Sequence, residues 1–88
     1  MDSVEMVDIT YYIALSFVWV GGDLLPGEAE ECLDLTMAVE RAQSLSREKG
    51  NAGALAYSQT FDTDREIPGE ALILKRLGDI PTDLSMLI

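Results

Sequence analysis

The chain has 88 residues, a length that fits one small domain spanning residues 1–88. It carries 16 acidic and 6 basic residues, for a formal net charge of −10. Phosphate backbones and anionic lipid headgroups repel such a chain, which argues against direct binding to nucleic acid or to a membrane. Hydrophobic residues make up 48% of the chain and charged residues 25%, a composition typical of a folded globular protein.

The residue types that mark secretion or membrane insertion are missing from their usual places. Cys32 is the one cysteine, so no disulfide can form within the chain. Met1 is followed by Asp2 and Glu5, where a secretory signal would carry positive charge. The longest apolar run, Tyr11–Val20, is about half of the roughly 20 residues needed to span a bilayer. We therefore expect a cytoplasmic protein.

The first element predicted in chain order is a β-strand at Tyr11–Val20. This segment is rich in aromatic and β-branched residues and is followed by Gly21 and Gly22. Alternation along a strand places two sets of side chains on opposite faces. The bulky set is Ile13, Leu15, Phe17 and Trp19, and the smaller set is Tyr12, Ala14, Ser16 and Val18. Residues 1–10 show no such period and predict a frayed start.

A weak strand and a helix are expected next. Residues 28–35 carry so many carboxylates that they fit only an edge strand, where charge blocks pairing between sheets. Met37–Lys49 is free of glycine and proline and repeats apolar residues at helical spacing. Asp34 or Thr36 can cap its start, and Gly50 suits a left-handed stop at its end.

The most legible part of the sequence is a β-hairpin. Two apolar runs, Ala54–Phe61 and Ala71–Leu77, flank a polar acidic connection. The order β-β-α-β-β predicts an α+β fold, with a small, mainly antiparallel sheet of three to four strands and one helix packed on one face. The two ends, residues 1–10 and 82–88, are expected to be flexible or to cover a partner.

A single helix cannot cover both faces of this sheet. A helix is about 10 Å across, whereas three or four strands span roughly 15–20 Å. We expect the helix to lie on the bulky side chains of Ile13, Leu15, Phe17, Leu55, Tyr57, Leu72 and Leu74. The opposite face then needs a second copy of the chain, the tail or another partner to cover it. Its candidate association residues are Tyr12, Ala14, Val18, Ala54, Ala56, Ile73, Leu84, Met86, Leu87 and Ile88.

Motifs that carry chemistry are scarce, and the sequence does not support an enzyme. There is no histidine, which removes the commonest general base and metal ligand. No phosphate-binding glycine motif occurs. Asp62, Asp64 and Glu66 could offer oxygens to a cation, but they lack the ligand number and turn glycine of a calcium loop. Cys32, among carboxylates, is interpreted as a small hydrophobic residue. No catalytic, cofactor or metal residue is assigned.

One segment carries a family resemblance. Between Thr36 and Pro81 the chain resembles short hypothetical proteins of proteobacteria that have a Gly-Ala-x-Ala-aromatic-Ser segment and a later Gly-x-Ala-x-x-Leu-x-Arg-x-Gly-Asp-x-Pro segment. The matching residues are Gly53, Ala54, Ala56, Tyr57, Ser58, Gly69, Ala71, Leu74, Arg76, Gly78, Asp79 and Pro81. That family has no assigned activity, so the resemblance implies a bacterial, stand-alone domain and no catalytic role.

Three hypotheses for the function follow. The first is a non-enzymatic, acidic domain that associates with protein, as a homodimer. The second is an acidic inhibitor or nucleic-acid mimic that occupies a basic groove on another protein. The third is a small-molecule-binding or catalytic domain with a pocket at the dimer junction, lined by Tyr57, Ser58 and Arg76.

Overall fold

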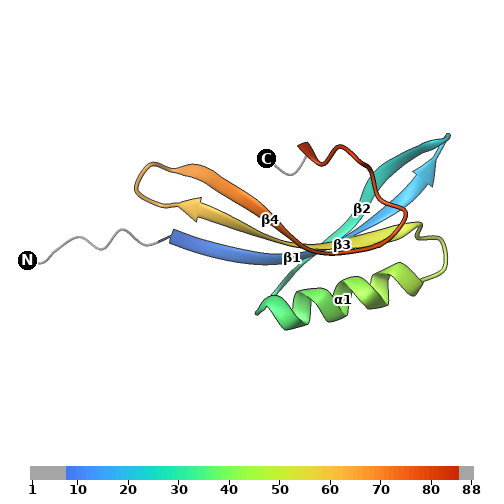
Figure 1. The fold of residues 1–88 in the computed structure, drawn as a ribbon, viewed down its shortest axis with the longest axis horizontal. Helices are drawn as coiled ribbons and strands as arrows, with labels where there is room; N and C mark the ends of the chain where they lie inside the picture. Colours follow the sequence, from blue (N-terminus) through green and yellow to red (C-terminus); the bar gives the residue numbers. More distant parts are fainter. Residues whose placement is uncertain (1–7, 86–88) are drawn as a thin grey trace, which may run out of the picture.

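The structure, a computed structural model, describes residues 8–85. Within this stretch one antiparallel sheet has the strand order β2-β1-β3-β4, and one helix lies below it in Figure 1. The elements are β1 (Asp8–Val20), β2 (Asp23–Cys32), α1 (Leu35–Arg47), β3 (Gly53–Asp62) and β4 (Ile67–Gly78). The predicted α+β fold class and the β-β-α-β-β order are confirmed.

Strand β1 begins earlier than predicted. Asp8, Ile9 and Thr10 pair with the far end of β3 and extend the strand to 13 residues. The prediction that the chain is frayed up to residue 10 is therefore wrong for residues 8–10, because their backbone groups are satisfied by a partner strand that lies about fifty residues away in sequence. Residues 1–7 lie outside the described part of the chain.

A tight hairpin joins β1 to β2. Gly21 and Gly22 both have positive φ, at 57° and 89°, which suits a two-residue turn whose twist matches the strands. Strand β2 lies at the edge of the sheet. The prediction that residues 28–35 belong to an edge strand is therefore confirmed, although its bounds differ. The strand begins earlier, at Asp23, and ends earlier, at Cys32.

The side chain of Ser16 forms hydrogen bonds with a β-bulge in this hairpin. The register between β1 and β2 shifts between Leu15 and Phe17, where Gly27 and Glu28 add a bulge to β2. The Glu28 N–H donates to Ser16 Oγ over 2.8 Å, and Ser16 Oγ donates to the Glu28 carbonyl over 3.4 Å. Ser16 is 2% exposed, so its hydroxyl is a buried polar group that the bulge satisfies.

Helix α1 connects two strands that run in the same direction on either side of β1, which a tight turn cannot do. Asp34 is its N-cap, and Oδ1 of Asp34 accepts from the Met37 N–H over 2.8 Å. At the other end Asn51 Nδ2 donates to the Leu45 carbonyl over 2.8 Å, and Gly50 has φ 96°.

The helix packs on the face of the sheet that was predicted to be free. Ala38, Ala42 and Leu45 of α1 form one buried cluster with Ala14, Ala54 and Ala56 of the sheet, all at 0% exposure. The expectation that α1 covers the bulky side chains is wrong except for Leu74, which packs against this cluster. Small side chains on both surfaces let the helix lie close to the strands, and the larger side chains then point away from it.

The bulky side chains form a second cluster on the opposite face. Leu15, Phe17, Leu55 and Tyr57 pack there, and Ile80 and Leu84 of the C-terminal segment lie against them. In Figure 1 this segment passes above the sheet, while α1 lies below it. We call the two sides the helix face, which carries Ala14, Ala54 and Ala56, and the tail face, which carries Leu15, Phe17, Leu55 and Tyr57.

Two glycines allow the chain to cross closely where β4 ends. A Cβ built on Gly53 would lie 2.3 Å from the Asp79 carbonyl oxygen, and one on Gly78 would lie 2.6 Å from the Ala52 carbonyl oxygen. The Asp79 N–H donates to that Ala52 carbonyl over 3.0 Å. Glycine is needed at both positions because a side chain at either one would meet backbone atoms.

Gly53→Ala is expected to lower the free energy of unfolding by about 3 kcal/mol, because backbone atoms would have to move to admit the methyl group. Gly50→Ala is the matched control: it has open space around it and only a positive φ to strain, which costs about 1 kcal/mol. Urea unfolding measures both, and equal losses would contradict the steric explanation.

Ser16→Ala leaves the Glu28 N–H of the bulge without its side-chain acceptor. We expect a loss of about 1–2 kcal/mol in the free energy of unfolding. Ser58→Ala is the control, because Ser58 is half-buried on the same face and no side-chain hydrogen bond is found for it. A loss below about 0.5 kcal/mol is expected there. If thermal and urea unfolding show the two variants to be alike, Ser16 does not stabilise the bulge.

Candidate functional site

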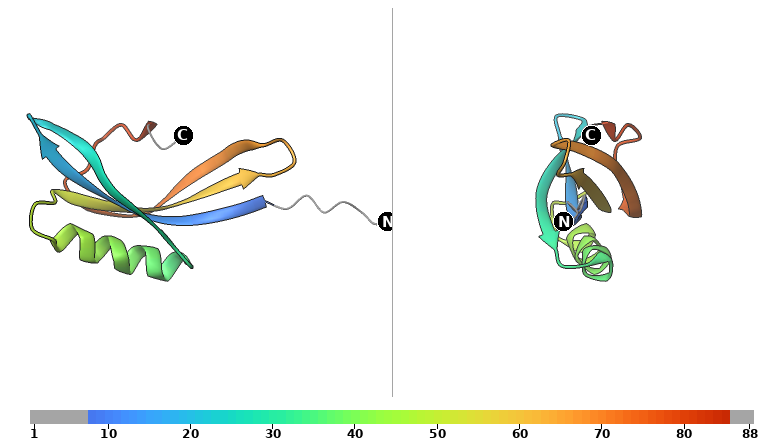
Figure 2. Two further views of the ribbon diagram at one scale, coloured as in Figure 1. Left: turned by 180° about the vertical axis from the view of Figure 1, so that it is seen from behind. Right: turned by 90° about the vertical axis from the view of Figure 1, so that its left-hand side faces the viewer.

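The sheet is longer than the layers that cover it. Strand β1 has 13 residues, which at about 3.3 Å each extend about 40 Å, whereas the 13-residue helix is about 20 Å long. Residues 8–11, 59–62 and 67–71 project beyond the start of α1, and we call this three-stranded part the wing. Figures 1 and 2 show it as the arm that neither α1 nor the described C-terminal segment covers.

The wing makes the molecule elongated. Its extents are 55 × 23 × 16 Å and its radius of gyration is 14.8 Å. A compact domain of this length has a radius of gyration of about 12 Å. The strands of the wing extend without a second described layer, and Ile9 and Tyr11 there are exposed.

The tail face of the wing is apolar. Ile9 and Tyr11 continue the tail-face alternation of β1 and are 39% and 36% exposed. Phe61 lies opposite Ile9, and Ala71 joins the row of Tyr11 through Gln59. No charged residue occupies a tail-face position of β1 from Ile9 onward. Apart from Gln59, the tail-face positions of the wing are apolar, and Ile9 and Tyr11 there remain partly exposed.

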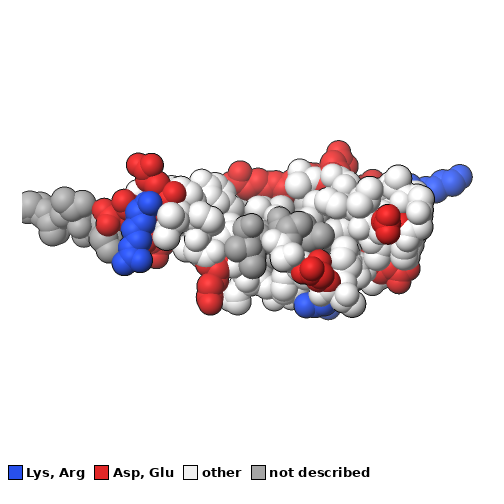
Figure 3. Space-filling view, turned by 90° about the horizontal axis from the view of Figure 1, so that it is seen from above, with Lys and Arg blue, Asp and Glu red and all other residues white. Residues whose placement is uncertain are grey.

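The tip of the wing is acidic, and Asp8 and Asp62 there alternate to the helix face. The turn at the tip of the wing holds Asp62, Asp64 and Glu66, and Asp8 lies directly opposite Asp62. Arg65 is the one base there and approaches Asp62 at 3.7 Å. In Figure 3 acidic residues gather at the left-hand tip beside one basic side chain, and others lie along the margins and within the right half of the face.

Arg76 lies on the tail face outside the wing. It pairs with Leu55, which pairs with Leu15, so it projects from the tail face well away from the tip. The described residues contain no ion pair to Arg76, and it is exposed.

The edge of the wing is irregular. The register between β3 and β4 shifts twice, at Ala56/Tyr57 and at Gln59/Phe61. At the second shift Gln59 Nε2 donates to the Gly69 carbonyl over 2.9 Å and to the Thr60 carbonyl over 3.1 Å. Gln59 Oε1 is buried and has no hydrogen-bond partner among residues 8–85. These bulges disturb the ladder that another strand would have to join.

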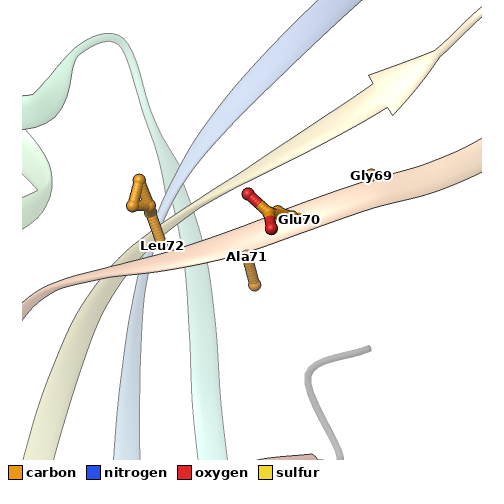
Figure 4. A pocket seen from close by; sticks show the side chains of 4 residues that line it. All are labelled: Gly69, Glu70, Ala71 and Leu72. Carbon is orange, nitrogen blue, oxygen red and sulfur yellow. The ribbon is translucent and has the colours of Figure 1, made fainter.

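An open hollow of about 480 Å³ lies beside this edge, lined by Gly69, Glu70, Ala71 and Leu72. Figure 4 shows Ala71 pointing to one side of β4 and Leu72 to the other. Glu70 supplies the one ionisable side chain of the lining, with no nucleophile beside it. The hollow therefore offers contact area and no evident reaction chemistry.

An ion pair ties edge strand β2 to the helix. Arg41 Nε donates to Glu30 Oε2 over 2.8 Å, and an Arg41 terminal nitrogen approaches the same oxygen at 2.6 Å. The hydrogen bond from Arg41 holds the pKa of Glu30 below its ordinary value, and the same bond raises the pKa of Arg41. Glu48 lies 3.7 Å from Arg41. A shallow hollow beside Arg41 is lined also by Met37, Glu40 and Ser44.

Cys32 lies half-buried near the start of α1. Burial raises the pKa of its thiol, and the nearby carboxylate of Glu30 raises it further. A raised pKa leaves little thiolate at neutral pH, so this environment does not activate a nucleophile.

The structure divides the predicted association residues between two faces. Ala14, Ala54 and Ala56 are fully buried under α1, so their assignment to an exposed association face is wrong. Tyr12 packs against the same cluster, and Val18 is half-buried on that side. Ile73 and Leu84 lie on the tail face instead. Met86, Leu87 and Ile88 lie outside the described residues.

The three residues proposed to line a pocket at the dimer junction, Tyr57, Ser58 and Arg76, do not share one face within a single chain. Tyr57 and Arg76 both belong to the tail face, whereas Ser58 pairs with Tyr12 and projects from the helix face. Sequence reasoning also missed Ile9 and Tyr11. The signal for them was present, because the alternation of Ile13, Leu15 and Phe17 continues back to Ile9 without interruption.

Comparisons with protein-family models, with curated proteins and with solved structures found no match. In the described part of the chain, no helix has the length and apolarity to cross a membrane. Across residues 8–85, no group of three or more histidine, cysteine or acidic residues is placed to hold a metal ion.

The ion pair predicts a titration that NMR can follow. Glu30 should titrate below the ordinary range of a glutamate, and Arg41→Gln should raise its pKa because the hydrogen bond is lost. A lowered folded-state pKa means that the pair stabilises the fold at neutral pH and loses this effect as the pH falls through that lowered pKa. Arg47→Gln on the same helix is the control and should leave the titration of Glu30 unchanged.

Proposed function

We propose that this chain is a non-enzymatic, acidic association domain that acts as a homodimer. The observation that carries the proposal is the tail face of the wing, where Ile9 and Tyr11 are exposed at 39% and 36% beyond the reach of α1. Apolar sheet surface of this kind marks an interface more often than a free surface. A second copy of the chain would supply the missing layer, as is common for small domains.

The cover from the chain's own C-terminal segment is partial. Ile80 and Leu84 lie against the cluster of Leu15, Phe17 and Leu55, near the middle of the sheet. This supports the hypothesis that the tail closes the tail face there. It leaves the wing as the part for which an external partner is proposed (Figure 1).

A second candidate is binding to a basic protein through edge strand β2. Asp23, Glu28, Glu30 and Glu31 lie along this strand, which carries no base. Arg41 already neutralises Glu30, however, and the bulge at Glu28 interrupts the edge. A partner that binds there would be released by salt, because exposed charge attraction is screened. For either candidate we propose a cytoplasmic place of action.

Sedimentation equilibrium at micromolar concentration is expected to give the mass of two chains. Tyr11→Asp should shift this mass to one chain, because it places a charge in the middle of the apolar surface. Thr10→Asp is the matched control, since Thr10 is the neighbouring exposed residue on the opposite face of β1, and it should remain a dimer. Circular dichroism checks that both variants fold.

A single-chain mass for the unchanged protein across this concentration range would contradict the homodimer. If Tyr11→Asp and Thr10→Asp dissociate the dimer equally, the interface does not lie on the tail face. A salt-labile complex with a basic protein, together with a single-chain mass, would favour the second candidate.

A further inference from the structure

We propose that the hairpin at the end of the sheet opposite the wing docks into another protein, in an apolar groove that has a basic group at its floor. This hairpin, which we call the finger, consists of residues 18–25, the end of β1, the glycine turn and the start of β2. It lies outside the surface proposed for self-association, so the inference adds a second partner of a different kind.

The finger is a two-stranded ribbon that neither β3 nor β4 extends to support. Strand β3 begins at Gly53, opposite Phe17, so β1 continues to Val20 with β2 as its one paired strand in the described chain. Figures 1 and 2 show this hairpin bending away from α1. Two strands without a third or a covering layer are marginally stable in water, so the finger depends on its base or on a partner.

Both faces of the finger are apolar. Trp19 pairs with Leu24 on the side of the tail face, and Val18 pairs with Leu25 on the side of the helix face. Trp19 is 55% exposed, and Val20 and Leu25 are 52% and 43% exposed. Clustered apolar exposure of this kind marks an interface, and tryptophan is among the residues that carry most of the binding energy there.

A flat surface can cover one face of this ribbon but not both. A second copy stacked against the finger would leave its opposite side in water. The hollow beside β4 of such a copy carries Glu70, whose carboxylate would repel Asp23 of the finger. The shape that buries both faces of a ribbon is a groove with two apolar walls.

Asp23 sets the chemistry of the groove floor. It is exposed beside the glycine turn, lies opposite Val20, and is the one charged residue of the finger. No ion pair to Asp23 is found within residues 8–85. When the finger enters a groove tip first, this carboxylate is buried and needs a compensating partner. A lysine or an arginine at the floor supplies one.

The backbone of Trp19 adds a directional contact. The Ala52 N–H donates to the Phe17 carbonyl over 2.8 Å, so this carbonyl points to the side of β1 on which β3 lies. Two residues further on, the N–H and C=O of Trp19 point to the same side, where no strand of the described chain continues. An extended segment in the groove wall can hydrogen-bond to these groups as an added strand does.

A lipid surface also surrounds a ribbon on both sides, but it fits the finger less well. The tip would carry the Asp23 carboxylate and the backbone groups of Gly21 and Gly22 into a layer that cannot pair them. The net charge of −10 also repels anionic headgroups.

The fluorescence of Trp19 tests the two competing occupants, because it is the one tryptophan of the chain. Its emission should be that of a solvent-exposed indole, from submicromolar to high micromolar protein and in the presence of phosphatidylcholine or phosphatidylglycerol vesicles. A blue shift that grows with protein concentration overturns the inference in favour of a second copy. A blue shift produced by vesicles overturns it in favour of lipid.

Photo-cross-linking tests the protein partner. In a Cys32→Ala background, Val20→Cys labelled with benzophenone is irradiated in an extract of the cells that encode the chain. One cross-linked protein is expected, and it should persist at high salt because the contact is mainly apolar. Its yield should fall about ten-fold with Trp19→Ser or with Asp23→Lys. Leu33→Ser, which changes an exposed leucine just before α1, is the matched control and should leave the yield unchanged.

The outcomes keep this inference separate from the proposed homodimer, which sedimentation decides. The absence of a cross-linked protein, or a yield that Trp19→Ser leaves unchanged, overturns the docking finger. A yield that Asp23→Lys leaves unchanged overturns the basic floor of the groove. A product that high salt removes belongs to the charge-based binding through β2 and also overturns the finger. Circular dichroism checks that each variant folds.

Discussion

The close packing of α1 on a row of alanines decides how the rest of the molecule is built. The sheet contacts the helix through the small side chains of Ala14, Ala54 and Ala56. The helix contacts the sheet through Ala38 and Ala42, which are equally small. This contact draws the helix onto the side of the sheet with the smallest residues. The larger side chains are left on the other side, where the C-terminal segment covers only the middle. The position of the exposed surface follows from that choice of side.

The elements and their order could be predicted because each leaves a local signal. The strand periods, the paired glycines of the first turn and the cap at Asp34 fixed what forms and in what order. The choice of helix side could not be made by size alone. We expected the bulky residues to meet the helix, but the alanines on the helix were the better guide, because two small surfaces pack closely while a large one and a small one leave a gap.

The register of β4 was the other part beyond local reasoning. Tyr57 lies opposite Ile73, so Leu72 and Leu74 face the helix side, away from Leu55 and Tyr57. A shift of one residue would have exchanged the two sets. The loop between the strands and two bulges set this register, and neither bulge has a sequence signal as strong as the glycine pair at Gly21 and Gly22. The candidate surface was missed for the related reason that the start of β1 depends on a distant partner.

The central place of β1 also has a consequence for how the chain reaches this structure. The hairpins β1-β2 and β3-β4 each pair strands that are consecutive in sequence. Strands β1 and β3 are paired in the sheet but are separated in sequence by β2 and α1, with Phe17 opposite Gly53 and Asp8 opposite Asp62. Closing so long a loop costs entropy before any contact repays it, and folds rich in such pairings fold slowly. The two hairpins can form alone on a microsecond scale. We therefore expect the step that joins them to limit the folding rate.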